Sequence, residues 1–134
     1  MKTRIYLPEY QRTFETLAGA ADYLTEQTEA EAAEIRCINE DGETMWVDGM
    51  ERNEKSGDFV YNAYYLGIAS TSEDFNENSD WIPEYNTEDE ALQSDKATKA
   101  LLNGKCIRVD LVATTCSETI ETVQEGKVIG GIRS

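Results

Sequence analysis

The sequence predicts an α+β fold in which two helices pack on an antiparallel sheet, in the order β-α-βββ-α-βββ. Three observations lead to this prediction. Capping patterns mark the ends of two helical segments. Other segments alternate apolar and polar residues or are rich in Val, Ile and Tyr, as strands are. Turn signals such as Asp41-Gly42 separate successive strands, which are therefore expected to pair as antiparallel neighbours.

Both helices have recognisable ends. Thr13 is a plausible N-cap, and apolar residues follow it at offsets of three and four to about Gln27. Thr87 opens the second helix, and Glu90 stands at capping-box spacing from it. Gly104 is a natural stop just past the second helix, because glycine adopts the left-handed conformation that ends many helices.

Seven segments read as strands, and one long segment reads as a loop. The expected strands are residues 3–7, 34–40, 43–47, 59–68, 105–113, 117–124 and 127–132. Residues 69–86 have no sustained period and are rich in Ser, Asn, Asp and Glu, which predicts an acidic loop. Loops of this length are usually functional or disordered. Trp81, Ile82 and Tyr85 indicate that this loop is held against the core.

Length and composition predict one folded domain over residues 1–134. The chain is 40% hydrophobic and has a net charge of −15, and self-repulsion of that size destabilises a compact state. The charge is uneven: residues 56–95 contain ten carboxylates and no Lys or Arg, whereas residues 96–134 have a net charge of +2. A localised acidic patch is therefore favoured over the dispersed acidic coat of a salt-adapted protein.

Several classes of activity lack the residues that they need. The chain has no His, so Ser-His and Cys-His catalytic pairs are impossible. No phosphate-binding or dinucleotide-binding glycine motif is present. Twenty-seven carboxylates guarantee accidental pairs, so paired carboxylates carry no specific signal. We expect a non-enzymatic protein without a cofactor or metal, and an enzyme using carboxylates, Cys116 or Tyr residues ranks last.

The cysteines and the hydropathy pattern bear on the compartment. Cys37, Cys106 and Cys116 form no CxxC motif, and we expect them to be buried free thiols in a reducing compartment. No secretory signal opens the chain, and no apolar run approaches the roughly 20 residues of a membrane span. These features predict a cytoplasmic protein.

One stretch has half of a calcium-binding pattern. Asp74, Asn76, Asn78 and Asp80 alternate as oxygen donors, as the first half of a calcium loop does. Ser79 stands where that loop requires Gly, and a tyrosine stands where it requires a bidentate Glu. Calcium binding is left open on this pattern.

The acidic stretch has three interpretations. Its carboxylates could simply be solvated, with the aromatic residues plugging the loop into the core. The aromatics could instead anchor a protein partner inside an acidic rim. The carboxylates could also imitate the phosphate row of a nucleic acid, because side chains three or four residues apart on a helix lie roughly 5–6 Å from each other. The predicted partner-binding residues are Glu73, Asp74, Phe75, Glu77, Asp80, Trp81, Glu84, Tyr85 and Glu88.

In size and charge the chain resembles the small acidic inhibitors encoded by phages and mobile elements, including anti-CRISPR and anti-restriction proteins that imitate DNA. The resemblance lies in overall character and carries over no residue. It implies an inhibitor in the host cytoplasm that occupies a basic, nucleic-acid-binding site on a partner protein. The alternative is an immunity protein that neutralises a basic nuclease toxin. Direct binding of nucleic acid is not expected at −15, and the oligomeric state is open.

Overall fold

The structure is a computed structural model that describes residues 2–73, 75 and 79–130. It is an α+β fold with an eight-stranded antiparallel sheet and, among the described residues, three helices. The elements are β1 (Arg4–Leu7), β2 (Arg12–Phe14), α1 (Leu17–Glu26), β3 (Ala32–Ile38), β4 (Thr44–Arg52), β5 (Phe59–Ala69), β6 (Asp80–Tyr85), α2 (Glu88–Leu92), α3 (Asp95–Leu102), β7 (Cys106–Thr114) and β8 (Thr119–Gln124). The strand order is β2-β1-β3-β4-β5-β7-β8, and β6 pairs with β5. The α+β class is confirmed, whereas the predicted order of elements and the count of two helices are wrong.

The chain divides into two compact units. Unit 1 comprises Met1–Asn62 and Ala113–Glu121, and unit 2 comprises Ala63–Val112 and Thr122–Ser134. The strands β5, β7 and β8 each contribute residues to both units. The expectation of a single domain stays a prediction.

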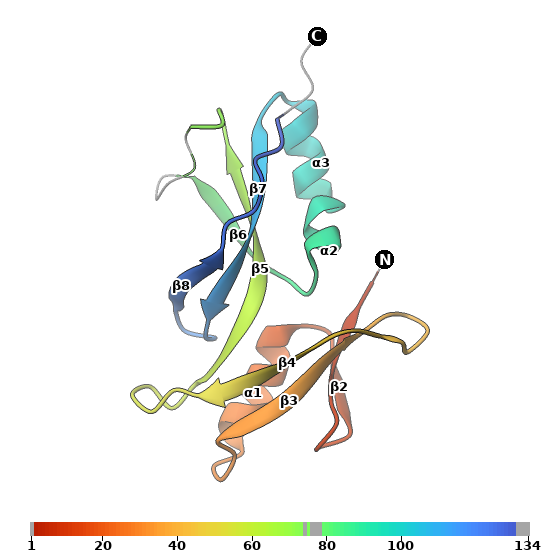
Figure 1. Ribbon diagram of the computed structural model, residues 1–134, viewed down its shortest axis with the longest axis vertical. Helices are drawn as coiled ribbons and strands as arrows, with labels where there is room; N and C mark the ends of the chain where they lie inside the picture. The colour runs from red at the N-terminus through yellow and green to blue at the C-terminus, as the bar shows by residue number, and fades with distance from the viewer. Residues whose placement is uncertain (1, 74, 76–78, 131–134) are drawn as a thin grey trace. The chain divides into compact units, whose positions relative to one another are not determined.

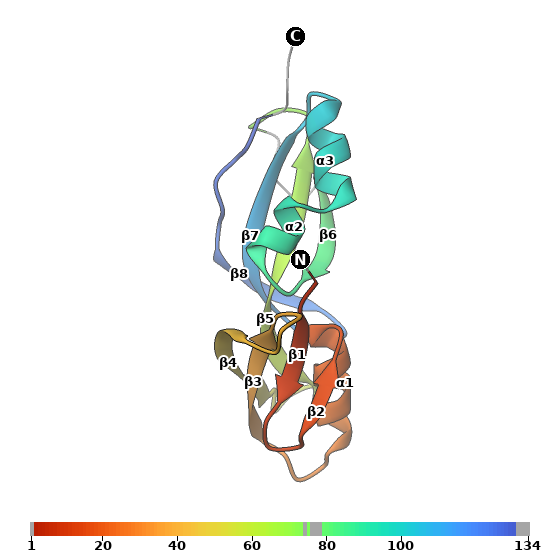
Figure 2. The same cartoon turned by 90° about the vertical axis from the view of Figure 1, so that its right-hand side faces the viewer.

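Unit 1 is built from α1 and the strands from β1 to β4, together with the start of β5. Helix α1 contacts β1 and β2 (Figure 2). Alternate residues of β1 and β3 are buried, because successive strand residues point to opposite faces of the sheet. The buried apolar residues of this unit include Ile5, Leu7, Leu17, Ala20, Ala21, Leu24, Ala33, Ile35, Cys37, Met50 and Phe59.

Arg52, near the end of β4, ties together the C-terminal end of α1 and the loops beside it. Its guanidinium donates to the carbonyls of Leu24 (3.3 Å), Thr25 (3.3 Å), Gln27 (2.8 Å), Ala30 (2.9 Å) and Gly57 (2.6 Å). Its Cζ atom also lies 4.8 Å from the ring centroid of Phe59. The last carbonyls of a helix have no partner within the helix, and a cation there also complements the helix dipole. Arg52 therefore joins β4 to the C-terminal end of α1 and to the neighbouring loops through five hydrogen bonds.

Unit 2 packs α2 and α3 against one face of β5, β6 and β7 (Figure 1). Small alanines on the helices meet large aliphatic residues on the strands, which lets the helices approach the sheet closely. The core cluster consists of Leu66, Ala91, Ala97, Ala100, Ile107 and Val109, and Tyr64, Ile68, Ile82, Tyr85, Leu92 and Leu101 pack around it.

The first helix begins later than predicted. Thr16 rather than Thr13 is its N-cap, and the Thr16 hydroxyl accepts a hydrogen bond from the backbone N–H of Gly19 at 3.1 Å. Thr13 lies in β2 instead, where its neighbour Phe14 pairs with Ile5 of β1. Both threonines precede apolar residues, so the sequence spacing does not show which one is the N-cap. The pairing of β2 with β1 places Thr13 in a strand and leaves Thr16 as the N-cap.

The predicted second helix is two helices. Thr87 caps α2, and Gly104, with a φ of 76°, follows α3, as predicted. Between them the Ser94 hydroxyl donates to the Ala91 carbonyl at 2.7 Å and accepts from the Ala97 N–H at 3.3 Å. Serine competes for backbone hydrogen bonds in this way, and here it ends one helix and begins the next.

Two further expectations are corrected. The segment 69–86 is not a loop throughout, because Asp80–Tyr85 form β6 and pair with β5. The predicted strand 127–132, whose last two residues lie outside the described part, forms one isolated bridge between Ile129 and Ile107. The aromatic and apolar residues of β6 were noticed in the sequence, but the intervening Pro83 and the acidic neighbours masked the strand pattern.

Candidate functional site

The seven predicted partner-binding residues that the structure describes fall on a loop, a strand and a helix start, all in unit 2. Asp74 and Glu77 lie outside the described residues. Glu73 is exposed and Phe75 is half-buried on the loop before β6. β6 carries Asp80, which is exposed, and Trp81, Glu84 and Tyr85, which are half-buried; Glu88 is exposed at the start of α2.

The strand β6 sends its side chains to two different faces of the sheet. Ile82 stands opposite Leu66 and packs on the core cluster under the helices. Trp81 stands opposite Gly67, so its indole lies on the other face. Tyr85 returns to the helix side, because the register shifts between Tyr64 and Leu66. The structure therefore does not bring Trp81 and Tyr85 together on one surface.

Trp81 and Phe75 instead pack around an arginine of β7. The Cζ atom of Arg108 lies 5.1 Å from the ring centroid of Phe75 and 5.1 Å from that of Trp81, and the two ring centroids are 6.2 Å apart. Arg108 donates from Nε and Nη2 to the two carboxylate oxygens of Asp110, both at 2.8 Å. We call Phe75, Trp81, Arg108 and Asp110 the arginine cluster.

Asp110 is the buried end of the arginine cluster. It is 2% exposed, and its Oδ1 atom also accepts a hydrogen bond from the backbone N–H of Gly126 at 3.0 Å. A buried carboxylate held by two charged and one neutral donor is fully paired. Arg108 and Asp110 are not among the residues predicted from the sequence. Their signal was two opposite charges two residues apart, and so on one face, within an otherwise apolar strand.

The arginine cluster accounts for the aromatic residues of the acidic segment. An arginine over an aromatic face is attracted by the ring quadrupole, and each such contact contributes about 0.5–1 kcal/mol at exposed sites. Phe75 and Trp81 therefore have a role in fixing the loop to the sheet. This arrangement favours the interpretation in which the aromatics plug the loop into unit 2.

Replacing Gly67 with alanine should disrupt the arginine cluster. A Cβ atom at Gly67 would lie 2.5–2.9 Å from three atoms of the Trp81 ring, so the indole must move. We expect a loss of about 1–3 kcal/mol in the free energy of unfolding, as for overpacked sites, with a red shift of Trp81 fluorescence. Gly49→Ala is the matched control, because its Cβ would meet nothing closer than 3.7 Å. Equal effects of the two substitutions would contradict the prediction.

Several carboxylates of residues 56–95 remain on the surface. Those that the structure describes as exposed are Glu73, Asp80, Glu88, Asp89 and Asp95. Folding redistributes the charge between the units: unit 1 carries sixteen carboxylates and six basic side chains, and unit 2 carries eleven and six. The net charges are thus −10 and −5, so the acidic surface of the protein extends beyond the segment that stood out in the sequence.

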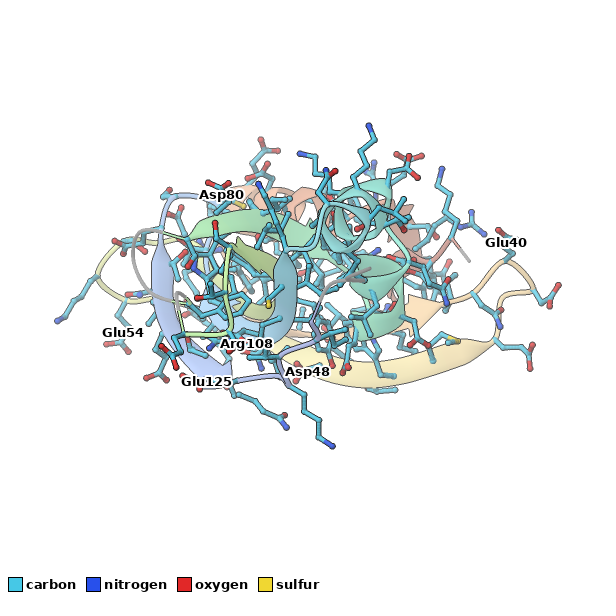
Figure 3. All side chains as sticks on the ribbon, turned by 90° about the horizontal axis from the view of Figure 1, so that it is seen from above. Glu40, Asp48, Glu54, Asp80, Arg108 and Glu125 are labelled. Carbon is cyan, nitrogen blue, oxygen red and sulfur yellow. The ribbon has the colours of Figure 1, made fainter. Side chains whose placement is uncertain are left out.

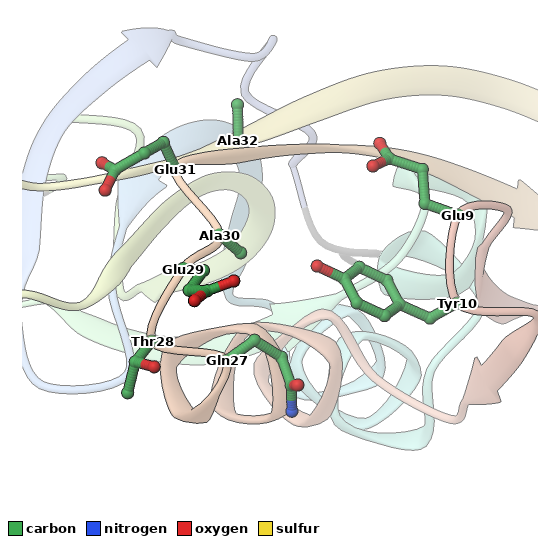
Figure 4. A pocket seen from close by; sticks show the side chains of 8 residues that line it. All are labelled: Glu9, Tyr10, Gln27, Thr28, Glu29, Ala30, Glu31 and Ala32. Atoms are coloured by element: carbon green, nitrogen blue, oxygen red, sulfur yellow. The ribbon is translucent and has the colours of Figure 1, made fainter.

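Unit 1 has a pocket that sequence reasoning did not find. It has a volume of about 640 Å³ and is lined by Glu9, Tyr10, Gln27, Thr28, Glu29, Ala30, Glu31 and Ala32. Figure 4 shows the Tyr10 side chain directed into the hollow between Glu9 and Glu29. No Lys or Arg lines the pocket. The lining offers carboxylate oxygens that accept hydrogen bonds, and hydroxyl and amide groups that can both donate and accept them.

Most of the calcium-like pattern, including Asp74, Asn76 and Asn78, lies outside the described residues. Within the described part of the chain, no group of three or more Cys, Asp or Glu is placed to hold a metal ion. None of the helices that the structure describes is both long and apolar enough to cross a membrane.

The three cysteines are free thiols, but they are not all buried. Cys37 and Cys106 are buried, as expected. Cys116 is exposed, and its Sγ atom lies 3.5 Å from the Ala18 carbonyl oxygen. The expectation of burial is therefore wrong for Cys116, which lies in the turn between β7 and β8 rather than in a strand.

Comparison with protein-family models, with curated proteins and with solved structures finds no match to this chain.

Proposed function

We propose that this protein is a non-enzymatic inhibitor that uses an acidic surface to occupy a basic, nucleic-acid-binding site on a partner protein, as some phage anti-defence proteins do. The observation that carries the proposal is the group of exposed carboxylates before β6, on β6 and on the first turn of α2, in a stretch of forty residues without one basic side chain. Proteins that bind nucleic acid gain much of their affinity from the phosphate charges. Carboxylates on a rigid scaffold present the same sign of charge without a nucleic acid.

Two observations reduce the set of residues that we assign to contact with the partner. Asp80 lies on β6, which pairs with β5 on one side, and Glu88 lies at the start of α2, so both positions are fixed by regular structure. Phe75 and Trp81 are engaged with Arg108, so we assign them to holding the surface rather than to contacting the partner. Glu88 and Asp89 also complement the helix dipole. The binding surface that we propose therefore centres on Glu73 and Asp80, with Glu88 beside them in sequence.

The test is a charge reversal with a matched control. The variant Glu73→Lys/Asp80→Lys/Glu88→Lys changes three exposed side chains of the proposed surface. The control Glu26→Lys/Glu54→Lys/Glu121→Lys makes the same change in net charge at three exposed side chains of unit 1. Wild type and both variants serve as baits in a bacterial lysate at low and high salt, and captured proteins are identified by mass spectrometry.

We expect the wild-type protein to retain nucleic-acid-binding proteins at low salt and to release them when duplex DNA is added as a competitor. The variant of the proposed surface should weaken capture by about 100-fold, because electrostatic complementarity governs such encounters and is screened by salt. The control should retain most of the capture. Equal loss in both variants would refute a localised site, and capture that duplex DNA does not reverse would refute occupation of a nucleic-acid-binding site. Retention of a nuclease toxin alone would favour the immunity protein.

A further inference from the structure

The last part of the chain that the structure describes, residues 125–130, runs along the strand β7 within unit 2 (Figure 1). Ile129 pairs with Ile107: the backbone N–H of each donates to the carbonyl of the other, at 2.8 and 2.9 Å. Nearer to β8, the backbone N–H of Gly126 donates to the carboxylate of Asp110 at 3.0 Å. We call residues 125–130 the C-terminal latch.

The C-terminal latch is held to β7 by its backbone rather than by buried side chains. Val128 is 41% exposed and Ile129 is 39% exposed, and the charged side chains of Glu125 and Lys127 are exposed as well. Among the described residues, the three hydrogen bonds given above are those that fasten the latch to β7. Segments with few buried apolar contacts open locally at a lower free energy than the core does. We therefore expect the latch to leave β7 while the rest of unit 2 stays folded.

Gly126 lies against the backbone of β7 with no room for a side chain. A Cβ atom at Gly126 would overlap the carbonyl oxygen of Val109, which belongs to the backbone of β7 and cannot swing aside as a side chain can. Gly130 differs, because a Cβ atom there would meet nothing within 4 Å. An alanine at Gly126 therefore pushes the latch off β7, whereas an alanine at Gly130 leaves it in place.

Asp110 connects the C-terminal latch to the arginine cluster. Its Oδ1 atom accepts from the N–H of Gly126 and also from Nε of Arg108, at 3.0 and 2.8 Å. Opening of the latch removes one donor from this buried carboxylate and lets water reach the ion pair, whose attraction falls as the surroundings become more polar. Arg108 in turn lies 5.1 Å from the ring centroids of both Phe75 and Trp81. A change at the latch is thus passed to the aromatic residues of the acidic segment.

We propose that the C-terminal latch controls the acidic surface of unit 2. With the latch on β7, Asp110 fixes Arg108, and Arg108 fixes the two aromatic residues that stand beside Glu73 and Asp80 in the chain. With the latch open, Arg108 loses its fixed position and the two carboxylates are no longer held in one arrangement. Figure 3 labels Asp80 on β6, Arg108 on β7 and Glu125 at the start of the latch. The inference rests on the proposed function, because it concerns the regulation of the same surface.

The test compares Gly126→Ala, which opens the latch, with Gly130→Ala as the matched control. Both are made in the Trp46→Phe protein, in which Trp81 is the one remaining tryptophan. Two quantities are measured in native buffer: the quenching of Trp81 fluorescence by acrylamide, and the hydrogen exchange of the backbone amides of α3. Helix α3 packs on the core cluster, on the face of the sheet away from the Trp81 indole, so its exchange reports on unit 2 as a whole.

We expect Gly126→Ala to raise the quenching constant of Trp81 by about twofold or more, while the exchange of α3 stays within about twofold of the parent protein, because the latch opens locally. Gly130→Ala should change neither quantity. A parallel rise in quenching and in α3 exchange would show that unit 2 as a whole is destabilised, and this would overturn the latch. Unchanged quenching in Gly126→Ala would overturn it as well.

A second variant opens the latch without steric overlap. Ile129→Pro removes the N–H that donates to Ile107, and the replaced side chain is 39% exposed. It should raise the quenching of Trp81 in the same way, and it takes the place of Gly126→Ala in the comparison if that variant does not fold. Quenching equal to that of the parent protein in Ile129→Pro would contradict the coupling between the latch and Trp81.

The latch and the proposed function fail separately, because quenching and exchange are measured without a partner. If Gly126→Ala raises the quenching of Trp81 while reversal of Glu73, Asp80 and Glu88 leaves lysate capture unchanged, the coupling stands and the acidic surface is refuted. If the reversal abolishes capture while Gly126→Ala leaves capture unchanged, the acidic surface stands and its control by the latch is overturned.

Discussion

Replacing Arg52 with methionine should lower the free energy of unfolding of unit 1 by about 3 kcal/mol. A hydrogen bond from a charged donor contributes about 1.5–3 kcal/mol to stability when the bond is shielded from water. Arg52 donates several hydrogen bonds, and all of them are partly buried. Methionine keeps much of the apolar stem and removes all of the donors. The carbonyls at the end of α1 would then depend on water, and the contact with Phe59 would lose its charge.

Arg36→Met is the control for this prediction. Arg36 also lies on a strand, but its ion pair with Glu34 is formed by side chains that are 41% and 43% exposed. Exposed pairs contribute at most about 1 kcal/mol. Urea unfolding followed by tryptophan fluorescence suits the comparison, since Trp46 lies in unit 1 and Trp81 in unit 2. If Arg52→Met and Arg36→Met had the same free energy of unfolding, the stabilising role that we assign to Arg52 would be wrong.

Replacing Asp110 with alanine should lower the free energy of unfolding of unit 2 by about 3–5 kcal/mol, the usual cost of removing one partner of a buried ion pair. The side chain of Arg108 is only 14% exposed and would keep its charge without the carboxylate, and the backbone N–H of Gly126 would lose its acceptor. Because Arg108 also holds Phe75 and Trp81, we expect the Trp81 emission to shift to the red.

A double variant distinguishes the loss of the Arg108–Asp110 ion pair from the cost of leaving Arg108 charged without its partner. Arg108→Met/Asp110→Leu removes both charges and fills the space with apolar atoms, so it should be more stable than Asp110→Ala. Unfolding by urea with fluorescence detection measures both. The outcome that would contradict the arginine cluster is a single variant as stable as wild type, or a double variant less stable than the single one.

The sequence carried much of the fold because the relevant signals were local. The α1 face, the Asp41-Gly42 turn, the cap at Thr87 and the stop at Gly104 each depend on residues within a few positions of one another. The strands that were not predicted, β2 and β6, depend on partners that are distant in the sequence. β2 exists because Phe14 pairs with Ile5, and β6 exists because Trp81 can lie over Gly67. Neither pairing is visible in a residue spacing.

The candidate site was predictable in its charge but not in its architecture. The acidic stretch was obvious from composition, and the suggestion that Trp81 is held against the rest of the protein agrees with its contact with Arg108. The identity of the residue that holds it was not, because Arg108 lies on a different strand, β7, and no spacing in the sequence links it to Trp81. The acidity of residues 38–51 was also hidden, since Arg36 before them and Arg52 after them reduce the average charge.

The division of the chain between the units has a consequence for how the protein can be taken apart. The chain leaves unit 1 after Asn62 and returns to it at Ala113, so in sequence residues 63–112 form an insertion within unit 1. The returning segment belongs to unit 1 chemically as well, since the Ser117 hydroxyl donates to Asp58 at 2.9 Å. No single cleavage of the chain yields either unit whole. A fragment ending at Asn62 lacks part of its own fold, and isolating unit 1 requires that residues 63–112 be replaced by a short linker.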